Sequence, residues 1–197
     1  MEDNKTHNLN IIDSQGYRLN IGIIIINQDN KLLWAQRSRQ NAWQFPQGGV
    51  QQGEKLYQAL YRELKEELGL EPSDVKIEAS TPGFLRYRLP AGLIRYDNHP
   101  LCIGQKQKWY LLRLINPDNH INLGLSDKPE FEHWMWVPYW YPLKYVISFK
   151  KDVYRKALNH FATIIFQGNG QSPLDPFIAQ PIPRRVYQKN TGDSEHS

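Results

Sequence analysis

Apolar residues occur along the chain either in short continuous runs or at helical spacing, and this pattern predicts the secondary structure. Runs rich in β-branched, aromatic and aliphatic residues are typical of strands; they cover 18–27, 31–36, 75–89 (two strands with a turn between them), 108–115 and 134–137. The polar segment 27–30 is typical of a turn, so the first two strands are expected to form a hairpin. The segment 37–49, which ends in a proline, a glutamine and two glycines, is expected to be a loop.

Two other stretches repeat their apolar residues at the spacing of an amphipathic helix. The first covers 54–68 and is followed by Gly69 and Pro72, which commonly end a helix. The second covers about 149–166, and Ser148 is expected to cap it. Strands mixed with helices predict one compact α/β domain with a mixed sheet.

Three glutamates lie on one side of the first predicted helix. Successive helical residues are about 100° apart, so Glu63, Glu66 and Glu67 share a stripe beside the apolar one. Glu63 and Glu67 repel each other, which weakens an isolated helix by about 0.2–0.5 kcal/mol. Such a run is usually a solvated face, but a hard divalent cation such as Mg²⁺, which prefers carboxylate oxygens and bridges to phosphates, would reverse the repulsion. Gly48 and Gly49, just upstream, would let the backbone come close to an ion or a phosphate.

A longer motif favours binding of a divalent cation over a solvated face. Residues 48–70 match G-x5-E-x7-R-E-U-x-E-E-x-G-U, in which U is aliphatic, at every fixed position. This motif is the Nudix box, so the chain resembles the Nudix hydrolase family. A phosphate-binding P-loop is excluded because Glu54 stands where that motif requires a lysine, although Gly48 and Gly53 have its spacing.

The resemblance extends beyond the box to one branch of the family, the bacterial RNA pyrophosphohydrolases. It is carried by DSQGYRLNIGIII, WQFPQGG, CIGQKQKW and PEFEHWMWVPYWYPLKYVISFKKDVYR, and it covers about 13–166. It implies an α/β/α Nudix sandwich around a mixed β-sheet and metal-assisted attack of water on a phosphoanhydride, with Mg²⁺ as cofactor and Mn²⁺ or another divalent ion as a substitute. The implied substrate is RNA with a 5′ triphosphate or diphosphate. Its terminal phosphates would leave as pyrophosphate or phosphate, and the remaining 5′ monophosphate would start mRNA decay.

The same resemblance assigns catalytic and metal-binding roles. The implied catalytic residues are Glu54, Arg62, Glu63, Glu66 and Glu67. The implied metal ligands are Glu63, Glu66, Glu67, the distant Glu130 and the carbonyl oxygen of Gly48. Glu66 is either a ligand or the group that positions or deprotonates the attacking water. Glu54 and Arg62 would lie on different faces of an ideal helix, so their contact requires the preceding loop to bend back, and Arg62 is expected to orient the acids.

Residues outside the box are the expected substrate contacts. They are Arg18, Arg37, Gln105, Lys108, Ile147, Phe149 and Lys150. By resemblance, Arg37 and Phe149 would hold an RNA base between them; the alternative is that Phe149 is an ordinary core residue. A base stacked in this way contributes about 1–3 kcal/mol. Ala42 stands where related proteins would have a serine, and it lacks the hydroxyl that would help to read the edge of that base.

Length and composition set the remaining expectations. The 197 residues suit a polar arm at 1–12, a hydrolase domain at 13–166 and a disordered tail at 167–197. The net charge of +4 permits an anionic partner without requiring one. A single cysteine, Cys102, excludes an intrachain disulfide and a thiolate zinc site. The first residues lack a secretory signal and the longest aliphatic run, 23–26, is too short to cross a bilayer, so we expect a cytoplasmic protein with no membrane partner.

The sequence leaves other functions open. A dinucleoside polyphosphate hydrolase of the Ap4A type is the main alternative, because related Nudix enzymes share the YR…G and WQ-x-PQGG segments. The basic segment 148–156 favours a longer anionic substrate over a dinucleotide or a free nucleotide. A noncatalytic Nudix-fold binding protein would typically lack some of the box carboxylates, and here all of them are present.

Overall fold

The computed structural model describes residues 11–126 and 128–166. Its strands are β1 (Tyr17–Ile26), β2 (Leu32–Arg37), β3 (Trp43–Gln44), β4 (Gln47–Gly49), β5 (Val75–Ser80), β6 (Leu85–Arg88), β7 (Gly104–Leu114) and β8 (Phe131–Val137), and its helices are α1 (Leu56–Leu68), α2 (Tyr141–Tyr145) and α3 (Lys151–Ile165). The predicted tail, and the predicted arm apart from its last two residues, lie outside this described part. No helix within it is long and apolar enough to cross a membrane.

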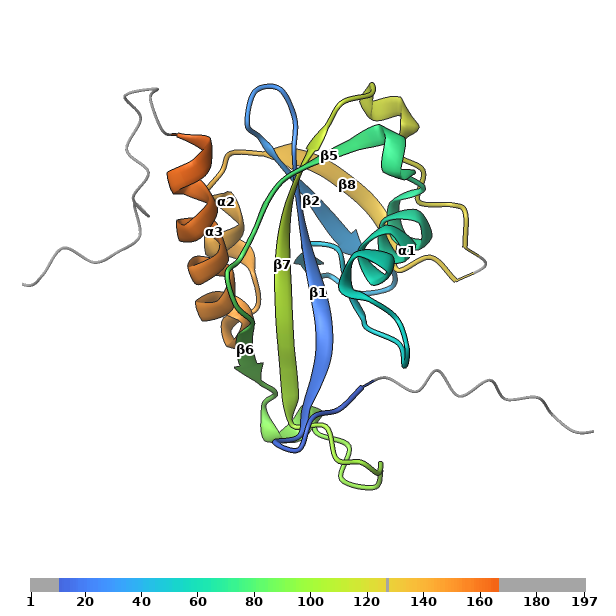
Figure 1. The fold of residues 1–197 in the computed structure, drawn as a ribbon, viewed down its shortest axis with the longest axis vertical. Helices are drawn as coiled ribbons and strands as arrows, with labels where there is room; N and C mark the ends of the chain where they lie inside the picture. Colours follow the sequence, from blue (N-terminus) through green and yellow to red (C-terminus); the bar gives the residue numbers. More distant parts are fainter. Residues whose placement is uncertain (1–10, 127, 167–197) are drawn as a thin grey trace, which may run out of the picture.

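Strands β1 to β8 form one mixed sheet (Figure 1). Its central path runs β3-β2-β1-β7-β5, while β4 pairs with β1, β6 with β7 and β8 with β2. The two central strands, β1 and β7, are parallel, with Tyr17 opposite Gly104 at one end and Ile26 opposite Arg113 at the other. The other pairings are antiparallel. The predicted mixed sheet is therefore confirmed.

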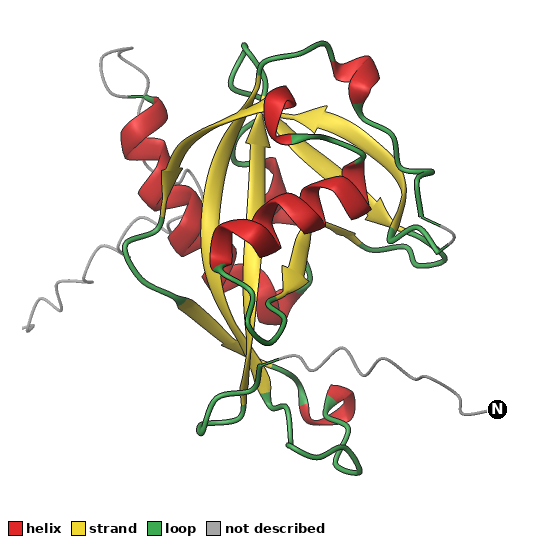
Figure 2. Cartoon of the chain, turned by 45° about the vertical axis from the view of Figure 1, so that its right-hand side comes forward, coloured by secondary structure: helices red, strands yellow, loops and turns green. Residues whose placement is uncertain are grey.

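Helices cover both faces of this sheet, which explains why β1 is apolar along most of its length (Figure 2). Ile21, Ile23 and Ile25 pack in a core with the apolar side of α1. Ile24 and Ile26 point the other way and pack in a second core with α3. A strand buried on both faces has no polar side and reads as a continuous apolar run. These two cores confirm the predicted α/β/α sandwich.

Several strand boundaries differ from the prediction because pairing within the sheet overrides the local sequence. The expected loop at 37–49 contains the short strands β3 and β4, and β4 pairs with β1 through Gly48 opposite Ile21. Strand β7 begins at Gly104 instead of residue 108, since β1 provides a parallel partner for the additional residues. Strand β8 likewise begins at Phe131, where it pairs with the end of β2.

The helices depart from the prediction at their first residues. Helix α1 begins at Leu56, not at residue 54, because the side chain of Glu54 is bound within the preceding turn. Helix α3 begins at Lys151 after a 3₁₀ turn, and the expected cap, Ser148, lies in that turn and does not cap the helix. The sequence pattern did not predict α2, whose five residues are too few to repeat a helical spacing.

An aromatic cluster joins α3 to the segment that leads into β4. Trp34, Phe45, Trp109 and Tyr154 are fully buried, and the ring centroids of Phe45 and Tyr154 are 5.0 Å apart in a stacked arrangement. The hydroxyl oxygen of Tyr154 accepts a hydrogen bond of 3.1 Å from the backbone N–H of Phe45. Burial raises the pKa of Tyr154, so its hydroxyl stays neutral. This bond fixes α3 against the residues that precede the glycines of β4.

Tyr154→Phe is expected to destabilise the protein, because it leaves the buried N–H of Phe45 without an acceptor. Such a loss costs about 1–3 kcal/mol, and each kcal/mol lowers Tm by about 2–4 °C in a chain of this size. Tyr96→Phe is the matched control, since Tyr96 is 63% exposed, and its Tm should equal that of the unmodified protein. Equal Tm values for the two variants in thermal unfolding would contradict the assigned role of the bond.

Candidate functional site

The site begins where β4 meets α1. Gly48 pairs with Ile21 of β1, and the carboxylate of Glu63 lies directly against the Gly48 backbone. A Cβ atom at residue 48 would lie 1.7 Å from Cδ of Glu63. No side chain fits in this space, so glycine is required here by close approach and not by a turn.

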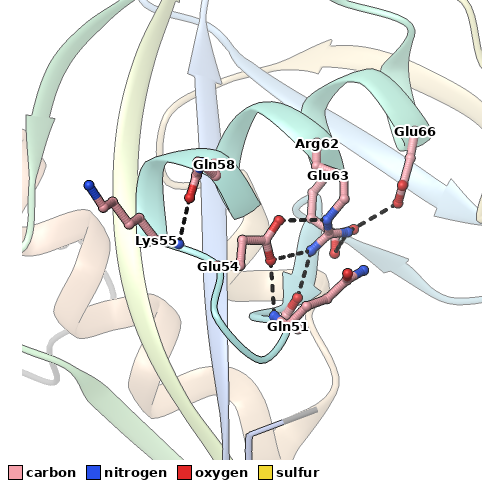
Figure 3. Close-up of polar contacts among 8 residues, drawn as sticks. Gln51, Glu54, Lys55, Gln58, Arg62, Glu63 and Glu66 are labelled. Carbon is pink, nitrogen blue, oxygen red and sulfur yellow. Dashed lines mark hydrogen bonds and ion pairs between the residues drawn. The ribbon is translucent and has the colours of Figure 1, made fainter. Parts of the chain in front are cut away.

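Arg62 gathers the acids around the start of α1 (Figure 3). Its guanidinium group donates to Glu54 from Nε at 2.8 Å and from Nη2 at 3.0 Å. Nη2 also donates to the Gly49 carbonyl oxygen at 2.8 Å, and Nη1 donates to Glu63 at 2.6 Å and to Glu66 at 3.2 Å. The turn before α1 bends back and brings Glu54 to Arg62, which is the geometry that their predicted contact requires. Arg62 thus contacts three carboxylates and offsets their mutual repulsion.

The surroundings shift the pKa values of the three acids in different directions. Hydrogen bonds from Arg62 lower the pKa of Glu54. Burial raises the pKa of Glu63, against the opposing effect of Arg62. Burial also raises the pKa of Glu67 well above its usual range, and the charges of Glu63 and Glu130 raise it further. Ionised Glu63 and Glu67 are therefore costly unless an additional cation is nearby.

These properties fit a hard divalent cation. Glu63 and Glu67 are 8% and 7% exposed, and carboxylate oxygens are the ligands that Mg²⁺ and Mn²⁺ prefer. Among residues 11–126 and 128–166, no three His, Cys, Asp or Glu side chains are arranged around one point as metal ligands. Instead, Glu63 is turned to Arg62, and Glu130 forms an ion pair of 2.8 Å with Arg37. A bound cation would therefore compete with these arginines for the carboxylates.

A cleft with two connected parts lies beside the acids. Its acidic part, of about 450 Å³, is lined by Glu63, Glu67 and Glu130, together with Arg18 and Gln105. Its larger, aromatic part, of about 980 Å³, is lined mainly by residues of β2, β3, α2 and the segment before α3. Five residues line both parts: Arg37, Gln44, Leu93, Phe149 and Lys150. The acidic part and the aromatic part of the cleft are thus continuous.

Most of the predicted substrate contacts meet at this cleft. Arg37 and Phe149 lie at the junction of its two parts, and Ile147, which is 50% exposed, lines the aromatic part. The ring of Phe149 lies 5.7 Å from that of Tyr87 and is partly buried: one side packs against the core, and the residue also lines both parts of the cleft. Glu66 lies apart from these groups, with a side chain that is 57% exposed and a contact to Arg62.

Lys108 lies outside the cleft. Gln105 and Lys108 are three residues apart on β7, so their side chains leave opposite faces of the sheet. Gln105 lines the acidic part. The ammonium group of Lys108 instead donates to the carbonyl oxygens of Thr81 and Pro82.

Two glutamines that the sequence reasoning missed hold Lys150 in the cleft. Lys150 is 7% exposed, and its Nζ donates to Oε1 of Gln44 at 2.8 Å and of Gln47 at 3.3 Å. Burial and the nearby charge of Arg37 lower the pKa of Lys150 to about 8. Because its close partners are neutral amides, the ammonium charge is available to an anion. The available signal was WQFPQ, which places the two amides on either side of a buried aromatic residue.

Comparisons with known proteins find similar sequences over most of the chain. The NUDIX domain family matches residues 16–157. An RNA pyrophosphohydrolase from Shewanella denitrificans is 57% identical over 161 residues, which are 81% of this chain and 94% of that protein. An RNA pyrophosphohydrolase from Hahella chejuensis is 54% identical over 157 residues, covering 80% of this chain and 98% of that protein.

Solved structures share the fold at much lower sequence identity. The E. coli dihydroneopterin triphosphate pyrophosphohydrolase aligns with a TM-score of 0.55 at 20% identity, over 70% of this chain and 92% of that one. A binary complex of a C. elegans Ap4A hydrolase aligns with a TM-score of 0.50 at 24% identity, over 70% and 93% of the two chains. At these identities the likeness concerns the fold alone.

Glu67→Gln is expected to raise Tm in the presence of EDTA at neutral pH. The folded-state pKa of Glu67 lies above its unfolded value, so ionisation lowers stability as the pH rises from the unfolded pKa through the folded one. The neutral amide removes this cost and retains an oxygen to accept the backbone N–H of Gln47. Adding Mg²⁺ or Mn²⁺ should raise Tm in the unmodified protein and much less in the variant, as measured by thermal unfolding.

The control for this experiment is Glu71→Gln, at a half-exposed carboxylate that pairs with Lys65 at the end of α1. It should keep the full increase in Tm on addition of metal. The same increase in Glu67→Gln would show that Glu67 takes no part in holding the cation.

Proposed function

The chain belongs to the Nudix family, and from this membership we propose that it is an RNA pyrophosphohydrolase. It is a hydrolase of phosphoanhydride bonds. The proposed substrate is RNA with a 5′ triphosphate or diphosphate, and the product is the 5′ monophosphate that starts mRNA decay in the cytoplasm. The observation that carries the proposal is the single cleft in which buried acids open onto an aromatic hollow edged by Arg37, Phe149 and Lys150. The relatives at 52–57% identity that bear this name support it.

The proposed reaction is attack of water on phosphorus. An oxygen of water bonds to phosphorus, the bond from that phosphorus to the bridging oxygen breaks, and the bridging oxygen leaves with phosphate or pyrophosphate. A divalent cation, which we propose to be Mg²⁺, would neutralise the developing charge and acidify a water when bound. Glu63, Glu67 and Glu130, with the Gly48 carbonyl oxygen, are the groups proposed to hold it.

The other residues of the box are proposed to position these groups or to assist the reaction. Arg62 orients Glu63 through the hydrogen bond of 2.6 Å, while Glu54 holds the far side of the same guanidinium group. Glu66 is exposed and turned to Arg62. It either completes the cation site or takes the proton from the attacking water.

The aromatic part of the cleft is the proposed site of an RNA base. Arg37 and Phe149 stand at its junction with the acidic part, where a base between them would place its own 5′ phosphates toward the acids. Stacking on such a platform contributes about 1–3 kcal/mol and tolerates any base. Ala42 lines this hollow and offers no hydroxyl to a base edge, which favours weak sequence preference at this position.

A dinucleoside polyphosphate hydrolase is the weaker alternative. Its support is the shared chemistry, because the likeness to the Ap4A hydrolase structure at 24% identity concerns the fold alone. The relatives that are 52–57% identical over most of the chain carry the other name.

A direct comparison of substrates tests the proposal. Triphosphorylated RNA, diadenosine tetraphosphate and free nucleoside triphosphates would be assayed side by side in Mg²⁺ and in EDTA. The expected result is the highest kcat/KM on the RNA, with activity abolished by EDTA and by Glu67→Gln but retained in Glu71→Gln. Faster cleavage of the dinucleotide would move the function to the alternative, and hydrolysis of none of them would indicate a noncatalytic protein.

The depressed pKa of Lys150 predicts a specific pH dependence. As the pH rises through about 8, the ammonium group loses its proton and its attraction for a polyphosphate disappears. Since kcat/KM reports the free enzyme, it should fall through this window, mainly by a rise in KM. A charge-assisted hydrogen bond corresponds to about tenfold or more in affinity.

Lys150→Met provides the comparison, because its side chain is of similar length and neutral at every pH. Its KM should be high already at pH 7 and should not rise further between pH 7 and 9. If the variant and the unmodified enzyme showed the same alkaline rise in KM, another group would be responsible for it.

A further inference from the structure

A third cavity, of about 370 Å³, opens beside the acidic part of the cleft. It shares four lining residues with that part: Arg18, Leu89, Leu93 and Gln105. With the aromatic part it shares only Leu93 and Arg95. The cavity therefore shares more of its wall with the acidic part than with the aromatic part, and Leu93 lines all three spaces. Its volume is at the low end of ligand sites, and the roles proposed above leave it unused.

Two arginines, Arg18 and Arg95, line this cavity. Within the described ranges, Arg18 and Arg95 form no ion pair, whereas Arg37, Arg62 and Arg113 each pair with a glutamate. The Nε atom of Arg18 is buried and has no hydrogen-bond partner. Buried donors nearly always have an acceptor, so an unsatisfied one needs an explanation such as a missing ligand. The fork of a guanidinium group matches the oxygens of a phosphate.

The cavity adjoins the acidic part, where the phosphoanhydride bond would be broken. A base in the aromatic part directs its 5′ phosphates to Glu63 and Glu67. In a displacement at phosphorus the leaving oxygen lies opposite the attacking one. The phosphates beyond the broken bond therefore leave the acidic part on the side away from the attacking water, and the adjoining cavity lined by Arg18 and Arg95 is open to them.

We propose that this cavity receives the leaving pyrophosphate, with Arg18 on the phosphate next to the broken bond and Arg95 on the outer phosphate. The proposal rests on the proposed function. Water bonds to the α-phosphorus, the bond from that phosphorus to the bridging oxygen breaks, and pyrophosphate departs with that oxygen. One proton of the water passes to solvent, by way of Glu66 if that residue is the base. With diphosphorylated RNA the leaving group is a single phosphate, which Arg18 holds alone. Arg95 is therefore a specificity residue that favours the triphosphate.

The test compares Arg95→Gln on triphosphorylated and diphosphorylated RNA of the same sequence. Losing one charge-assisted contact should lower kcat/KM on the triphosphate about tenfold or more and leave the diphosphate nearly unchanged. Inorganic pyrophosphate should inhibit the variant less than the unmodified enzyme, while inhibition by orthophosphate stays the same. Arg95→Lys should recover part of both effects, because it restores the charge.

Arg88→Gln is the matched control, since Arg88 is an exposed arginine on β6 that lines none of the three spaces. It should behave as the unmodified enzyme. An equal loss on both RNAs in Arg95→Gln, with unchanged inhibition by pyrophosphate, would place Arg95 on the RNA chain and overturn the proposal. If the unmodified enzyme did not turn over RNA, the proposed function would fail. Direct binding of inorganic pyrophosphate, measured by calorimetry in the unmodified protein and in Arg95→Gln, would then decide the role of Arg95.

Discussion

The site depends on one guanidinium group, that of Arg62, which holds together acids that would otherwise repel one another. It is bound on one side by Glu54 and on the other by Glu63 and Glu66, and it also donates to the carbonyl oxygen of Gly49. The arginine thus ties helix α1 to strand β4 and to the turn between them. Its charge allows a cluster of carboxylates to exist in the folded chain before any other cation is bound.

Arg62 offsets only part of the repulsion among the acids. The remaining negative charge is what a divalent cation can bind. Arg62 does not contact Glu67, whose pKa burial raises well above its usual range. Glu130, whose charge also raises the pKa of Glu67, is paired with Arg37, one half of the proposed base clamp. A divalent cation between Glu67 and Glu130 would favour both carboxylates and release Arg37 toward the base. The ion pairs of the structure thus connect the proposed cation site with the proposed RNA site.

Contacts within the Nudix box were easier to predict from the sequence than contacts of residues outside it, because residues of one helix have a fixed spacing. Glu63 and Glu67 are one helical turn apart, so their common side follows from the helix alone. The contact between Glu54 and Arg62 depends on the turn before α1, so the sequence predicted it only if that turn bends back. Lys108 was predicted as a substrate contact together with Gln105, but their odd separation on one strand puts the two side chains on opposite faces of the sheet.

Some contacts of the cleft depend on packing between segments that are far apart in the sequence, and no local sequence pattern predicts them. Lys150 is buried because α3 is held against the segment before β4 by the Tyr154 bond, which brings Gln44 and Gln47 to its ammonium group. Similarly, Arg95 reaches the cleft from the segment between β6 and β7, where the sequence has no regular period.

The most direct test of the central claim is a crystal structure of the protein with Mn²⁺ and a non-hydrolysable 5′-triphosphorylated dinucleotide, with the metal located by its anomalous scattering. The account predicts Mn²⁺ in direct contact with Glu63 and Glu67, a base between Arg37 and Phe149, and the ion pair of Arg37 with Glu130 broken. Metal bound away from these two glutamates, with the nucleotide outside the cleft, would contradict it.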